Sequence, residues 1–129
     1  MNKSILITAT ILGVLSVVLG AFAAHGLKKL ISPDALASFE TGVKYQMYHA
    51  LFLLFVGSST YVSNGFKSAI FYLVLIGIVF FSGSIYGLAT NSLSAFDFKK
   101  IAFITPIGGL LLIIAWVTLL VNFIKLKLE

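Results

Sequence analysis

The sequence predicts an all-α integral membrane protein: four transmembrane helices in an antiparallel bundle, with an interfacial amphipathic helix between spans one and two. The mean hydropathy is +1.10, and 60% of the 129 residues are hydrophobic while 10% are charged. Four long apolar stretches each approach the roughly 20 residues that a helix needs to cross a ~30 Å hydrocarbon core. We therefore expect a single domain over residues 1–129, with spans at about 5–24, 43–62, 69–88 and 101–124.

The first span is expected to be a retained helix. Lys3, the apolar run after it and the small residues around Phe22 are similar to a signal peptide, but the run is longer than such peptides normally have. Small residues recur along this span at helical spacing and form one face on which another helix can pack closely: Ala9, Gly13, Ser16, Gly20 and Ala24. Gly26 is expected to end the helix.

A second helix is predicted to begin at Pro33. Ser32 suits the N-cap, a proline suits the first turn, and Asp34 is favourable near a helix N-terminus. An apolar stripe follows at Leu36, Phe39, Val43 and Met47, which makes the segment amphipathic. One helix from here to the end of the second span would be about 45 Å long, more than the hydrocarbon core. We therefore expect a bend near Gly42, with residues 33–41 lying along the membrane interface.

The connectors set the arrangement of the spans. Residues 63–68 form a short polar turn, so the second and third spans should be antiparallel neighbours, and four spans place both termini on one side, here called the termini side. The opposite side is called the connector side. The lysines are expected to flank the spans and snorkel, and they divide too evenly to fix the orientation: Lys3, Lys67, Lys125 and Lys127 against Lys28, Lys29, Lys44, Lys99 and Lys100.

The polar residues within the spans gather in the leaflet of the connector side. Polar groups inside a bilayer need partners, so we predict one hydrogen-bonded polar cluster made of His25, Glu40, Lys44, Gln46, His49, Tyr86 and Thr105. These residues can also have purely structural roles. Glu40 and Lys44 at i, i+4 can neutralise each other, and His25 can hydrogen-bond a carbonyl at the end of its helix. His49 either pairs with a neighbouring helix or binds a ligand.

Motifs for catalysis or cofactor binding are absent from the sequence. There is no GxSxG, HExxH or P-loop motif and no pair of intramembrane carboxylates, and the lack of cysteine excludes thiol catalysis and thiolate metal sites. A metal ion or haem held between His25 and His49 stays an alternative. We expect no enzyme activity, no cofactor and no metal. The net charge of +5 comes from lysines at span ends, so no nucleic-acid partner is expected.

Four segments at these same polar positions carry a family resemblance: LGAFAAHGL (19–27), FETGVKYQMYHAL (39–51), SGSIY (82–86) and TPIGG (105–109). They strongly resemble the small bacterial YgdD/YwdK-like membrane protein family, a domain of unknown function. The resemblance covers nearly the whole chain, and Ala23 stands where that family often has glycine. It implies a four-span protein of the bacterial cytoplasmic membrane, and it implies no reaction and no catalytic residue.

The function expected from the sequence is a non-enzymatic accessory or stabilising role in the bacterial envelope. Membrane lipids are the expected partners, together with a second copy of the chain or other membrane proteins. The alternative is a small channel or transporter for protons, metal ions or a small polar solute. Such a channel needs a continuous polar path, which the apolar half of the spans on the termini side does not supply: Ile11, Leu12, Leu54, Phe55, Ile70 and Leu119. A third class, a membrane enzyme or haem carrier, would need a cofactor.

Overall fold

The computed structural model describes residues 2–127, which fold into helices and short connecting turns without any strand. Three helical stretches are long and apolar enough to cross a membrane: Asn2–Lys29, Asn64–Ala89 and Ile104–Lys125. A fourth helix, Pro33–Ser58, has 26 residues and is therefore about 39 Å long. The first half of this helix carries most of its polar side chains, which is why its mean hydropathy is lower than that of the other three stretches. The predicted all-α fold class is confirmed.

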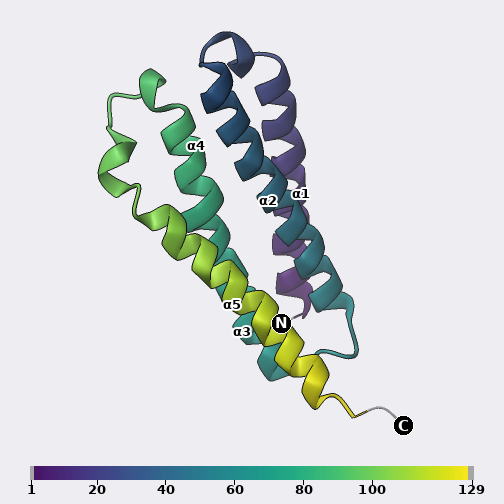
Figure 1. Ribbon diagram of the computed structural model, residues 1–129. Coiled ribbons are helices and arrows are strands. Elements are labelled where there is room, and N and C mark those ends of the chain that lie inside the picture. Colours follow the sequence, from purple (N-terminus) through teal and green to yellow (C-terminus); the bar gives the residue numbers. More distant parts are fainter. Residues whose placement is uncertain (1, 128–129) are drawn as a thin grey trace.

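Two helical hairpins lie side by side in Figure 1. Helix α1 runs antiparallel to α2, and the chain from α3 through α4 runs against α5, with the ends marked N and C at the same end of the bundle. Short 3-10 turns fill the two connectors on the other side. The elements in order are α1 (Asn2–Ala24), η1 (Leu27–Lys29), α2 (Pro33–Ser58), α3 (Asn64–Ile78), η2 (Val79–Gly83), α4 (Ser84–Ala89), η3 (Asn91–Leu93), η4 (Phe98–Ile101) and α5 (Ile104–Lys125).

Helix α2 begins as predicted, but it lacks the predicted bend and ends before residue 62, the predicted end of the second span. The Ser32 hydroxyl caps it by accepting a hydrogen bond from the Ala35 N–H at 3.1 Å. The structure has no break at Gly42, so residues 33–41 are the first part of α2 rather than a helix of their own, and α2 ends at Ser58. Gly42 instead allows a close approach: a Cβ built there would lie 2.8 Å from the Tyr86 ring.

The third predicted span is one continuous stretch of helix, Asn64–Ala89, with a π-helical turn, η2, in its middle. The backbone of α5 packs directly on this turn, because Gly108 has no side chain to hold the two helices apart. A Cβ at Gly108 would lie 2.4 Å from the Phe81 nitrogen and 2.7 Å from the Phe80 carbonyl carbon. Small residues at helix contacts are how membrane helices gain close packing without a hydrophobic driving force.

The packed interior is divided into two apolar clusters. The larger one occupies the termini-side half and includes Ile5, Leu53, Val56, Ile70, Val74 and Leu112. The smaller one, on the connector side, contains Ala23, Leu27, Phe39 and Ala89. Large apolar side chains also cover the outer faces of α1 and α5, where they are more than half exposed: Ile11, Val14, Val17, Leu110, Ile113, Leu120 and Ile124. An apolar exterior of this kind is suited to contact with lipid.

Candidate functional site

Gln46 of α2 is the residue that joins the most helices in the polar region. Its side chain is 4% exposed, and its Nε2 donates to the Leu12 carbonyl of α1 at 2.9 Å. The Tyr86 hydroxyl of α4 donates to the Gln46 Oε1 at 2.6 Å. The orientation of the amide follows from the partners, because a backbone carbonyl only accepts and must face the amide nitrogen. One side chain therefore connects α1, α2 and α4.

The π-helical turn supplies a second set of bonds beside this one. Ser82 is fully buried, and its hydroxyl donates to the Gly42 carbonyl of α2 at 2.7 Å. Ser84 donates to the carbonyls of its own turn, so the Thr105 hydroxyl of α5 is the donor in the bond between Ser84 and Thr105. Serines at these two positions thus tie the third helical stretch to α2 on one side and to α5 on the other. A π turn often marks a functional position in a helix.

His49 lies one turn beyond Gln46 along α2 and is 4% exposed. Its Nδ1 is 2.7 Å from the Tyr45 carbonyl, and the Trp116 indole N–H donates to its Nε2 at 3.2 Å. A carbonyl only accepts and an indole N–H only donates, so His49 is a neutral imidazole with its proton on Nδ1. Both ring nitrogens are occupied, and a metal ion or haem iron would have to displace one of these bonds.

An apolar pocket of about 290 Å³ opens beside His49, between α2 and α5. Its lining combines aromatic and aliphatic side chains with the bare backbone of Gly109: Tyr45, His49, Phe81, Leu112, Ile113 and Trp116. The Phe52 and Trp116 rings pack against each other next to it, tilted by 52° with centroids 4.2 Å apart. Because the ring nitrogens of His49 are already bonded, the pocket offers shape and apolar surface rather than acid–base chemistry.

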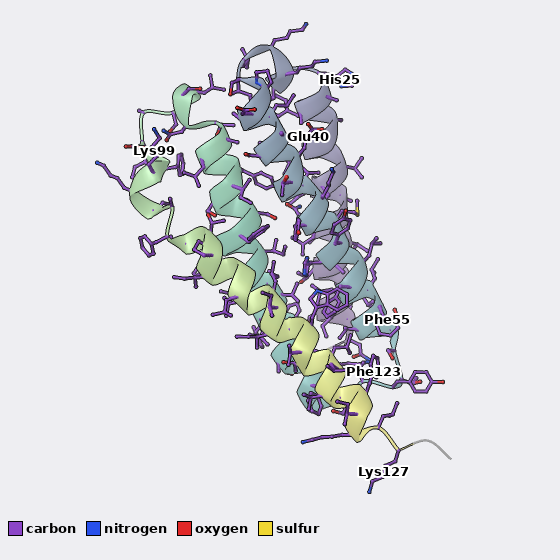
Figure 2. The ribbon with its side chains drawn as sticks, in the orientation of Figure 1. His25, Glu40, Phe55, Lys99, Phe123 and Lys127 are labelled. Atoms are coloured by element: carbon purple, nitrogen blue, oxygen red, sulfur yellow. The ribbon has the colours of Figure 1, made fainter. Side chains whose placement is uncertain are left out.

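The seven predicted site residues are only partly brought together. Gln46 and Tyr86 bond directly, while Thr105 and His49 take part in separate bonds to Ser84 and Trp116. The other three do not join the cluster: Glu40 and Lys44 are exposed, and the Nδ1 of exposed His25 bonds the Ala21 carbonyl at 2.8 Å within its own helix. Figure 2 shows His25 and Glu40 at the connector end of the bundle.

Glu40, Lys44 and His25 stay outside the cluster because residues at a similar depth in the membrane can still lie on different faces of their helices. The buried residues of α2 include Phe39, Gly42, Gln46, His49 and Leu53, which repeat at the spacing of one helical face. Glu40 and Lys44 are i, i+4 neighbours on another face. A continuous α2 also places His49 some 16 residues beyond Pro33, about 24 Å along the helix, whereas His25 lies beside the start of α2.

Lys67 is a buried cation that the sequence interpretation missed. It was expected to snorkel at the membrane surface, but its side chain is 4% exposed, and its Nζ donates to the Asn2 side-chain oxygen at 3.1 Å and to the Gly57 carbonyl at 3.4 Å. The signal was present in the sequence, because Lys67, Ile70, Phe71 and Val74 share one buried face of α3 at i, i+3, i+4 and i+7. An ammonium group at the C-terminal end of α2 is favoured by the helix dipole.

Asn122 of α5 is a second buried polar residue with a positioning role. Its Oδ1 accepts from the Ser63 N–H at 3.2 Å, and its Nδ2 donates to the Tyr61 carbonyl at 2.9 Å. Both the oxygen and the nitrogen of the amide thus hydrogen-bond the backbone of the connector between α2 and α3. Asn122 follows Ala115 and Leu119 on the buried face of α5, which is the pattern that would have identified it from the sequence.

We predict that the bond between Gln46 and Tyr86 gives a clear coupling energy in a double-mutant cycle. Gln46→Leu leaves the partly buried Tyr86 hydroxyl without its acceptor, and Tyr86→Phe leaves the amide oxygen without its donor, so each single change should cost about 1–2 kcal/mol of unfolding free energy. Once one partner is gone, removing the other should cost less, so the double variant should be more stable than the sum of the singles indicates. Unfolding in detergent, followed by circular dichroism, gives the four values, and strict additivity would contradict the bond.

Comparisons with known proteins give a consistent result. Residues 19–109 match a family model described as a protein of unknown function, DUF423. The chain is 39% identical over 127 residues to a UPF0382 membrane protein of Haemophilus influenzae, covering 98% of both chains. It is 39% identical to the UPF0382 membrane protein YwdK of Bacillus subtilis over 95% of this chain and 98% of that one. It is also 38% identical to the UPF0382 inner membrane protein YgdD of Escherichia coli, over 98% of this chain and 93% of that one. No solved structure matches.

Proposed function

We propose, for a chain that belongs to the DUF423 family of UPF0382 membrane proteins, a non-enzymatic accessory role in the bacterial cytoplasmic membrane. In this proposal all four long helices cross the membrane, with both termini on one side. The bundle acts through its lipid-facing surfaces, by contact with lipids or with other membrane proteins. It does not act by chemistry or transport at its polar residues.

The observation that carries the proposal is that the polar groups inside the bundle are used to hold its helices together. Among residues 2–127, no buried side-chain nitrogen or oxygen lacks a hydrogen-bond partner. Gln46 joins three helices, Ser82 joins η2 to α2, and Asn122 joins α5 to a connector. A reaction site directs polar groups into a space that a substrate can occupy, whereas these groups hydrogen-bond to the backbone of a neighbouring segment or, for Gln46 and Tyr86, to each other.

The channel alternative is weakened by the layering of the interior. The Gln46–Tyr86 bond lies on the connector side of the larger apolar cluster. The His49–Trp116 bond borders that cluster through Phe52, and the buried Lys67 lies at its other end. The cluster between them includes Leu53, Val56, Ile70 and Val74. A charged or hydrated solute crossing this layer within one protomer would lose its hydration without any polar replacement.

A flux measurement tests the proposal. Liposomes that contain the purified full chain should leak protons and potassium ions no faster than protein-free liposomes. His49→Ala should lower the stability of the bundle in detergent by roughly 0.6–2 kcal/mol, because it removes the acceptor of the Trp116 N–H, yet leave the flux unchanged. Reproducible wild-type flux that His49→Ala abolishes, in a variant shown to be folded, would overturn the proposal in favour of a transporter.

A further inference from the structure

A polar and basic pocket lies at the termini-side end of the bundle. It has a volume of about 350 Å³ and is called here the rim pocket, after its position between the connector that follows α2 and the end of α5. Six residues with polar groups line it: Thr60, Tyr61, Ser63, Asn122, Lys125 and Lys127. Figure 2 shows Lys127 and Phe123 at this end, with Lys99 and His25 at the opposite one.

Asn122 of α5 holds the wall of the rim pocket in place. The two hydrogen bonds of the Asn122 amide fix the connector backbone at Tyr61 and Ser63 onto α5. Ser63 is the N-cap residue of α3, yet its side chain makes no capping bond, so helix α3 does not use the hydroxyl and a ligand can bind it. The pocket is therefore a preformed cavity with a hydroxyl donor in its wall.

The electrostatics of the rim pocket favour an anion. Lys125 and Lys127 are both exposed and line the cavity. Among residues 2–127, no acidic side chain lines it. Lysine is a point-charge ligand for phosphate, and hydroxyl groups complete such sites as hydrogen-bond donors. The pocket also lies where the apolar helix Ile104–Lys125 ends. That level corresponds to the head groups of the lipid bilayer.

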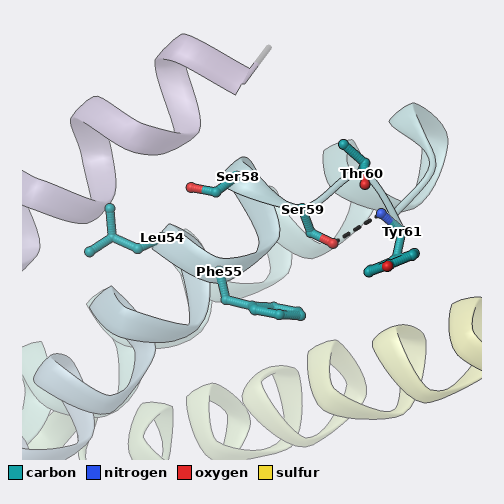
Figure 3. A pocket seen from close by; sticks show the side chains of 6 residues that line it. All are labelled: Leu54, Phe55, Ser58, Ser59, Thr60 and Tyr61. Atoms are coloured by element: carbon teal, nitrogen blue, oxygen red, sulfur yellow. Dashed lines mark hydrogen bonds between the residues drawn. The ribbon is translucent and has the colours of Figure 1, made fainter.

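A second pocket adjoins the rim pocket and is more apolar. It has a volume of about 480 Å³, shares Thr60 and Tyr61 with the rim pocket, and extends along α2 past Leu54 and Phe55. Figure 3 shows these two side chains on the last turns of α2, beside the connector in which the Ser59 hydroxyl accepts from the Tyr61 N–H at 3.0 Å. A ligand that fits both pockets needs an anionic group and a hydrocarbon chain joined together.

We propose that this end of the bundle binds one anionic phospholipid. Its phosphate lies in the rim pocket against Lys125, Lys127 and the Ser63 hydroxyl, and one acyl chain follows Leu54 and Phe55 along α2. The inference goes beyond the proposed function, since it holds whether or not the bundle conducts ions. Basic pockets at the ends of membrane helices are a known physical solution for anionic head groups.

The proposal is tested by titrating lipid onto the detergent-solubilised full chain and counting bound lipid by native mass spectrometry. Phosphatidylglycerol should bind more tightly than phosphatidylcholine. The double variant Lys125→Gln/Lys127→Gln should weaken phosphatidylglycerol binding roughly 25-fold, because each lysine near an anionic head group contributes about fivefold. The double variant Lys99→Gln/Lys100→Gln removes the same charge at the connector side and should bind as the wild type does.

Three results would overturn the proposal. Unchanged binding in Lys125→Gln/Lys127→Gln would show that the lipid does not bind in the rim pocket. Equal weakening of binding in both double variants would show that lysines attract the lipid by charge alone, wherever they lie. Displacement of the lipid by inorganic phosphate alone would make free phosphate the occupant. Ser63→Ala keeps every charge and loses no capping bond, so it should fold normally and weaken binding severalfold. It therefore checks the site independently of the lysine variants.

Discussion

Replacing Gly108 by alanine is expected to destabilise the bundle by about 3 kcal/mol or more, at the upper end of overpacking costs in proteins. The added methyl group would lie 2.4 Å from the Phe81 nitrogen and 2.8 Å from the Gly77 carbonyl oxygen. Both are backbone atoms of a helix, which cannot move aside as the end of a flexible side chain can. Helix α5 would have to shift away from η2, and unfolding in detergent should occur at a markedly lower temperature.

The neighbouring glycine provides the matched control. A Cβ at Gly109 would lie 3.5 Å from the nearest carbon of the Phe81 ring, which is an ordinary van der Waals contact. Gly109→Ala should therefore leave stability unchanged or raise it slightly, since alanine is favoured over glycine in helices by up to about 1 kcal/mol. If Gly108→Ala were as stable as Gly109→Ala, this result would contradict the direct backbone contact between α5 and η2.

The sequence was sufficient to predict the helices but not how they touch. Hydropathy located the apolar stretches, and the capping signals at Ser32 and Pro33 located the start of α2. Gly42 was ambiguous, because an isolated glycine indicates either a break or a close approach, and only the position of the Tyr86 ring decides between them. The π turn at Val79–Gly83 has no sequence signature, since an i→i+5 turn is stabilised by tertiary packing such as that on Gly108.

The sequence predicted the candidate site only where the depth of a residue in the membrane determines its hydrogen-bond partner. Gln46 and Tyr86 were placed in one cluster from their depth in the spans, and they form a direct bond. Trp116 was missed as the partner of His49 because it lies in an apolar stretch, where one indole N–H gives no polar signal. Lys67 was missed because a lysine near a span end usually snorkels. The burial of its own helix face, visible at Ile70 and Val74, was the better guide.

Reversing the charge of Lys67 is the second substitution with a large expected effect. In Lys67→Glu a carboxylate would replace an ammonium group that donates to the Asn2 oxygen and the Gly57 carbonyl. The carbonyl only accepts, so the carboxylate would be buried against an acceptor at the negative end of the α2 dipole. Leaving a buried charge without compensation costs about 3–5 kcal/mol, and the unfolding free energy in detergent should fall by that amount.

Two further variants separate burial from charge. Lys67→Met keeps the unbranched side chain and introduces no uncompensated charge, so it should cost less than about 1.5 kcal/mol. Lys3→Glu reverses an exposed lysine at the same end of the bundle and should change stability by about 0.5 kcal/mol or less. If Lys67→Glu were as mild as Lys3→Glu, the Lys67 ammonium would lie in water, and the snorkelling expected from the sequence would hold. A large loss in Lys67→Glu alone would instead show that the first turn of α3 is fixed by a charge inside the bundle, held between α1 and the end of α2.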